Sequence, residues 1–151
     1  MVLAAYGDTV WKLLLLGHIL SFVVAFAPAV INPVLGAQSK KDGESELIRV
    51  SGYMAQNGRR IHFPALLALG AFGILMVLQS DPIFEFDQTW VGLAILVWLA
   101  LCGVITGLVL PAERRLAAGD LAAEAKVAMG GQLATVLLLV QLYLMIWKPG
   151  L

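Results

Sequence analysis

The stretch that decides the fold is KLLLLGHILSFVVAFAPAVINP, which runs from Lys12 to Pro33. After its first residue it holds one ionisable side chain, His18. A helix of about 20 residues spans the roughly 30 Å hydrocarbon core of a bilayer, so this run is long enough to cross a membrane. What His18 contacts then depends on how other helices surround it.

The whole chain has the composition of a membrane protein. Its 151 residues are 60% hydrophobic and 13% charged, whereas soluble domains carry about 25% charged residues. The apolar residues are gathered in four runs without a charge, each about as long as a membrane-crossing helix or longer. These runs cover residues 13–39, 61–80, 88–112 and 127–147.

Four such runs predict an all-α fold, a four-transmembrane-helix bundle that forms a single integral membrane domain over residues 1–151. Helices joined by short loops are antiparallel neighbours, so we expect an up-down-up-down order. The first run is expected to be retained and not cleaved as a signal peptide, because residues 1–10 hold no Lys or Arg. The expected helices are about 11–35, 61–80, 89–110 and 127–147.

Basic residues are concentrated in two loops. The loops after the first and third runs hold eight Lys and Arg residues, whereas the other side has Lys12, Lys148 and the acidic loop SDPIFEFDQT. The positive-inside rule therefore predicts a multi-pass protein of the cell membrane with both termini outside. Three tryptophans at the expected outer boundary are typical of an aromatic belt, namely Trp11, Trp90 and Trp147.

The first basic loop includes a mixed segment. Residues 44–58 alternate apolar and charged side chains, which predicts a short amphipathic helix at the cytoplasmic interface that ends at Gly58. Contacts with lipid headgroups and the topology signal explain the basic residues, so the bilayer is an expected partner and nucleic acid is not.

One side of the first helix carries its small and polar residues. They recur every three or four positions, which is the repeat of one helix face. This seam is expected to face the other helices, and the missing N–H of its proline predicts a bend. Its members are His18, Ser21, Ala25, Pro28 and Asn32.

Small residues also predict close helix contacts elsewhere. Gly103 and Gly107 form a GxxxG pattern, and Gly130 and Ala134 have the same separation. The pattern allows two helix backbones to approach closely but does not name the neighbour, which is another helix of this chain, a second copy in a homodimer, or a membrane-complex partner.

His18 is the centre of the candidate site. Counting along the helices places it about 9 Å inside the outer boundary, at nearly the depth of Gln141 on the fourth helix, with Trp98 in the same layer. One interpretation is an interhelical hydrogen bond from imidazole to amide, worth about 1 kcal/mol. The other is a ligand for haem b or copper, because intramembrane ionisable residues indicate function.

A single imidazole needs a second ligand. His62 is a weak candidate, since it begins the second helix on the cytoplasmic side and is expected to lie about 20 Å away in depth. It is better explained as an interfacial residue near lipid headgroups. Met76, Gln141 or the His18 of a second chain are the remaining partners.

The opening WKLLLLGHILS, with a basic residue at the membrane edge and an early histidine, resembles small uncharacterised bacterial four-helix membrane proteins. It is distantly similar to the superfamily of the copper-resistance protein CopD and the HemJ-type protoporphyrinogen oxidase. The resemblance implies a prokaryotic inner-membrane protein and contact of His18 with haem or metal. HemJ-like proteins also have a lysine in helix 3, which residues 88–112 lack, so only His18 is carried over.

Two functions stay open. The first is a redox or metal-handling protein centred on His18, and the second is a non-catalytic assembly or packing subunit of a larger membrane complex. No catalytic residues are expected, because the four runs contain no Asp or Glu and the chain has no HExxH motif.

Overall fold

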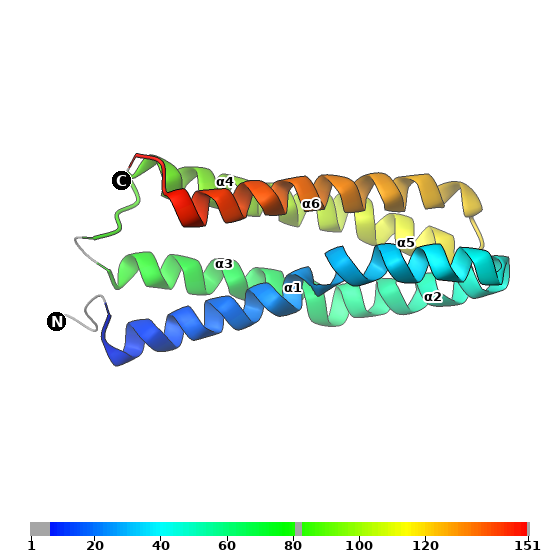
Figure 1. Ribbon diagram of the computed structural model, residues 1–151, viewed down its shortest axis with the longest axis horizontal. Helices are drawn as coiled ribbons and strands as arrows, with labels where there is room; N and C mark the ends of the chain where they lie inside the picture. The colour runs from blue at the N-terminus through cyan, green and yellow to red at the C-terminus, as the bar shows by residue number, and fades with distance from the viewer. Residues whose placement is uncertain (1–6, 81–82, 151) are drawn as a thin grey trace.

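The computed structural model of the chain describes residues 7–80 and 83–150, and every regular element among them is a helix (Figure 1). Four of its helical rods are long and apolar enough to cross a membrane, which confirms the predicted all-α four-helix fold. Asp81, in the acidic loop, lies outside the described residues. The elements are α1 (Thr9–Asp42), α2 (Glu44–Asn57), a π-helical turn (Gly58–His62), α3 (Phe63–Leu78), α4 (Thr89–Val104), a second π-helical turn (Ile105–Val109), α5 (Leu110–Ala117), a 3₁₀ turn (Leu121–Ala123) and α6 (Glu124–Trp147).

The rods extend beyond the uncharged runs. With 34 residues, α1 is about 51 Å long at 1.5 Å per residue, whereas a hydrocarbon core is about 30 Å thick. The second rod joins α2 to α3 without a break and has 35 residues. Hydrogen bonding of the helix ladder continues past the first charged residue, so the charges do not mark where the helix ends.

The segment 44–58 is helical, as expected, but Gly58 does not end it. Gly58 has φ −51° and ψ −50°, an ordinary helical conformation. A Cβ at this position would lie 2.8 Å from Cδ2 of Leu110, so the glycine allows close contact between the α2–α3 rod and α5. The amphipathic face of α2 packs on α1 and α5 and does not lie free on the membrane surface.

The rods associate in pairs. In the half of the bundle that holds the termini, α1 packs mainly on α3 and α4 mainly on α6, while α2 packs on α5 in the other half. Figure 1 shows both chain ends at one end of the bundle and the turn between α1 and α2 at the other. An ion pair of 2.7 Å between Lys40 Nζ and Glu124 Oε1 joins the two basic segments at that second end.

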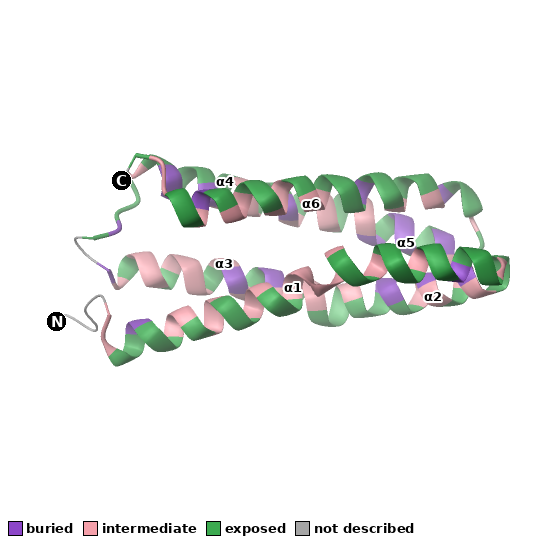
Figure 2. Ribbon diagram, in the orientation of Figure 1, coloured by how far each residue is buried: buried purple, intermediate pink, exposed green. Residues whose placement is uncertain are grey.

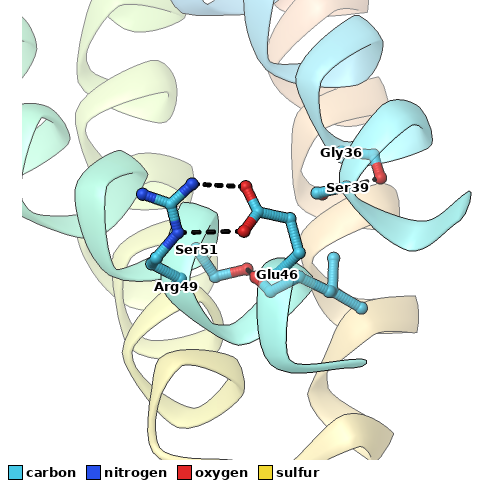
Figure 3. A network of polar contacts seen from close by, with 6 residues as sticks. Gly36, Ser39, Glu46, Arg49 and Ser51 are labelled. Atoms are coloured by element: carbon cyan, nitrogen blue, oxygen red, sulfur yellow. Dashed lines mark hydrogen bonds and ion pairs between the residues drawn. The ribbon is translucent and has the colours of Figure 1, made fainter. Parts of the chain in front are cut away.

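Several polar groups at this second end are satisfied within their own helix. Arg49 forms two hydrogen bonds with Glu46, Nε to Oε2 at 2.9 Å and Nη2 to Oε1 at 2.6 Å (Figure 3). The buried hydroxyls of Ser39 and Ser51 donate to carbonyls three and four residues earlier. Such bonds neutralise polar groups locally, and they leave the contacts between helices largely apolar.

Large apolar side chains cover the outside of the bundle. Figure 2 shows exposed residues along every long helix, and Leu13, Leu96 and Leu139 are each more than 60% exposed. Soluble monomers rarely expose contiguous apolar surface of this extent. Within α1 the five seam residues are all half-buried, whereas Leu16, Leu20, Val23 and Val24 are exposed, which confirms the predicted inward face.

Two of the three belt tryptophans point inward. Trp11 and Trp90 are 8% and 5% exposed and pack with Phe84 and Val91 in one buried cluster. Trp147 is exposed and stacks on Tyr143 at 5.1 Å. The expected lipid-facing belt is therefore wrong for Trp11 and Trp90, because the loop after α3 folds over the bundle end and Phe84 packs edge-on against Trp90.

Candidate functional site

A cavity of about 390 Å³ lies between α1, α3, α4 and α6, in the half of the bundle that holds the termini. We call it the outer cavity. Its volume is within the range of small-molecule pockets, about 300–1,000 Å³. The wall is mainly apolar and aromatic, and the structure brings His18, Trp98 and Gln141 to it together.

The His18 imidazole is held in one tautomer. Its Nδ1 lies 2.9 Å from the carbonyl oxygen of Leu69 on α3. A carbonyl only accepts, so Nδ1 carries the hydrogen and Nε2 keeps its lone pair. Among the described residues no hydrogen bond to Nε2 is formed. A histidine that ligates a metal is commonly oriented in this way, through the N–H of its other ring nitrogen.

Glycines on α3 make room for this arrangement. A Cβ at Gly73 would lie 3.2 Å from Cε1 of His18, and a Cβ at Gly70 would collide with the indole of Trp98. The Trp98 indole N–H donates to the carbonyl of Leu66 at 2.8 Å. Each of these carbonyls accepts its helical hydrogen bond from the N–H of a glycine four residues later. Because that glycine has no side chain, the second lone pair of the carbonyl is open to a donor from another helix.

Gln141 does not bond His18. The imidazole-to-amide hydrogen bond considered from the sequence is wrong, because the Leu69 carbonyl takes the Nδ1 hydrogen. The Gln141 Oε1 atom is buried and has no hydrogen-bond partner among the described residues. Leaving a buried acceptor unsatisfied costs about 1–3 kcal/mol, so the outer cavity offers an oxygen that a ligand N–H or O–H would satisfy.

The weak candidate His62 has a structural task. Its Nδ1 lies 2.7 Å from the carbonyl oxygen of Val24. Val24 is four residues before Pro28, whose missing N–H leaves this carbonyl without its helical donor. His62 replaces that donor from the second rod. It lines a different cavity from His18, so the two histidines do not share a site, whereas Met76 does line the outer cavity.

A second cavity of about 730 Å³ lies in the half of the bundle that holds the α1–α2 turn. We call it the inner cavity. Glu113 on α5 lines it and is 3% exposed. Glu113 directly follows the third uncharged run, and the rod that contains this run continues through Ala117.

Glu113 is not evident from the sequence as a buried residue, because it lies just beyond the uncharged run and two arginines follow it directly. The spacing of three residues between Leu110, Glu113 and Leu116 was the pattern that could have indicated its burial. The three residues share one helix face, and all three are buried. A carboxyl group between two buried leucines on that face belongs to the interior of the bundle.

The described residues contain no group of three or more His, Cys, Asp or Glu side chains that would hold a metal ion. Comparison with known proteins gives no match, because no family model, no curated protein and no solved structure is significantly similar to this chain. The similarity of the opening residues to the CopD and HemJ-type superfamily therefore stays a prediction.

Proposed function

We propose that the chain is a cell-membrane protein that binds haem b in the outer cavity, with His18 as an axial ligand, and serves a redox role. The observation that supports this most is the bond from His18 Nδ1 to the Leu69 carbonyl. It leaves Nε2 available on the wall of an apolar, aromatic cavity. Haem bound there would supply one-electron chemistry at its iron.

The residues present offer donors for copper and for haem, and the apolar, aromatic wall is what favours haem. Copper sites combine several soft or imidazole donors, and the donors of this kind on the outer cavity wall are His18, Met76 and Met145. A porphyrin needs one or two axial ligands and a large apolar surface, which the aromatic wall provides. Met76 or Gln141 would be the second axial ligand, or the His18 of a second copy.

The charge distribution supports the proposed orientation. The two basic segments meet through Lys40 and Glu124 at the bundle end opposite the chain termini, and both lie in that half of the bundle. With the cytoplasm at that end, the outer cavity opens in the half of the membrane that faces away from the cytoplasm. A redox partner would then approach from that side.

An absorption spectrum with metal analysis tests the proposal. The chain, purified in mild detergent and supplied with haemin, is expected to show a Soret band and about one iron per one or two chains. His18→Ala should lose both. His62→Gln is the matched control, since it changes the other histidine but keeps a donor for the Val24 carbonyl, and it should retain the band. A colourless protein, or equal spectra for all three chains, would contradict haem binding.

A non-catalytic assembly subunit is the second candidate, and one observation favours it. Nothing in the described part of the chain comes within 4 Å of a Cβ built at Gly103 or Gly107. The GxxxG face of the third rod is therefore open to a helix of another chain. This function predicts a metal-free protein that self-associates or co-purifies with a partner, and Gly103→Leu should abolish that association.

A further inference from the structure

Glu113 is a buried acid without a protein partner. Its side chain lines the inner cavity, and no hydrogen bond or ion pair to it is formed among the described residues. The neighbouring arginines do not neutralise it, since Arg115 is bound to Asp120 and Arg114 is exposed. Glu113 differs in this from the acids at the same end that do form ion pairs, Glu46, Asp120 and Glu124.

Burying a carboxylate without compensation is expensive. Acids buried among apolar side chains are rare unless they are paired, and an unpaired one commonly shifts its pKa and becomes neutral. The Glu113 carboxyl group therefore either carries a proton or faces a cation that enters the inner cavity. An apolar occupant such as a lipid tail would leave the group uncompensated.

The wall of the inner cavity suits a large cation with an apolar body. It is chiefly apolar and includes the rings of Phe26 and Phe63, and an aromatic face attracts a cation within about 6 Å. The carboxyl group lies next to Gly58, since a Cβ built there would be 3.6 Å from Glu113 Oε2. A glycine at this position brings no side-chain donor or charge to the acid.

Other ligand classes fit less well. Ca²⁺ takes six to eight oxygen ligands and Mg²⁺ about six, and the described residues hold no cluster of three acidic or metal-binding side chains. An anion would meet the repulsion of Glu113. The lysine on the wall, Lys40, is already paired with Glu124 at 2.7 Å, so it does not offer a free positive charge.

We propose that the inner cavity is a binding site for a lipophilic organic cation, such as a protonated amine or a quaternary ion with an aromatic or alkyl body, and that Glu113 is its counter-ion. This site is separate from the proposed haem site. It therefore stands or fails independently of haem binding at His18.

Binding of tetraphenylphosphonium to the full chain in detergent tests the proposal by equilibrium dialysis. The wild type is expected to bind about one cation per chain. Glu113→Gln keeps the side-chain volume and removes the charge, and should weaken binding at least about tenfold. The control Glu46→Gln removes an ion-paired acid of α2 outside the cavity and should leave the Kd within about twofold. Triphenylphosphine oxide, a neutral probe of similar shape, should not distinguish the variants.

A labelling experiment decides the question if Glu113→Gln does not fold. Dicyclohexylcarbodiimide reacts with protonated carboxyl groups in apolar surroundings, and should add one reagent mass to the wild-type peptide that contains Glu113. Tetraphenylphosphonium should protect that peptide, and triphenylphosphine oxide should not. Equal binding by Glu113→Gln and the wild type, or labelling of Glu113 without protection by the cation, would overturn the proposal.

Discussion

At the scale of single residues, the candidate site depends on which atom each side chain uses. His18 bonds through Nδ1 to a carbonyl that is already part of the α3 helix, and Trp98 does the same one turn away. Carbonyl oxygens have two lone pairs, so these bonds do not weaken the helix ladder. Both rings are thereby fixed in orientation, while the reactive nitrogen of His18 is left unbonded.

Gly70 is the residue on which the Trp98 bond depends most directly. In Gly70→Ala the new Cβ would collide with the indole, and overpacking of this kind costs about 1–3 kcal/mol. We expect a lower midpoint in SDS unfolding and a shift of the Trp98 fluorescence. Gly92→Ala is the control, since nothing lies within 4 Å of its added Cβ, and it should be neutral or slightly stabilising. Equal stability of the two variants would contradict this packing.

At the scale of the elements, the hydrogen-bond ladder of α1 lacks one donor, and a residue from another helix replaces it. Pro28 removes one donor from its ladder, and His62 supplies a replacement at the Val24 carbonyl. Figure 1 shows α1 changing direction near the middle of its length, as a proline kink does. The α1 and α2–α3 rods are therefore joined by a hydrogen bond at the kink itself.

A double-mutant cycle tests this bond. His62→Ala leaves the Val24 carbonyl without a donor and is expected to destabilise the fold by about 1 kcal/mol in SDS unfolding. In the Pro28→Ala background residue 28 again has an N–H, so the same histidine change should cost much less. Additive effects of the two substitutions would show that His62 and Pro28 do not act on one carbonyl.

The elements also show what sequence alone can predict. The α1 seam and the four apolar runs follow from residue patterns, because lipid and protein interior select different side chains on opposite helix faces. The true helix ends do not follow from the runs, since charged residues of α2 and α5 extend the same ladders beyond them. Glu113 was missed for this reason, and the His18 bond to Leu69 was missed because backbone acceptors leave no mark in a sequence.

At the scale of the whole molecule, two cavities follow one another along the long axis of the bundle. The buried cluster formed by Leu66, Leu69 and Leu101 borders both, since Leu66 lines the inner cavity and the other two line the outer one. These side chains are at most 5% exposed. An apolar layer of this kind separates the sites, so ligand binding in one is expected to proceed without a continuous wet path from the other.

The orientation of the bundle decides which compartment each cavity serves. The eight basic residues of the two loops support the proposed orientation, in which the inner cavity would lie on the cytoplasmic side and the termini outside. In a Cys102→Ser background, Gly150→Cys should react with a membrane-impermeant maleimide in intact cells, because Gly150 lies at the end that holds the termini. Lys41→Cys should react only after permeabilisation, since residue 41 is in the last turn of α1 at the opposite end. The reverse labelling pattern would place the outer cavity on the cytoplasmic side and the inner cavity on the outer side. The proposed redox partner would then have to approach from the cytoplasm, and the proposed cation from outside.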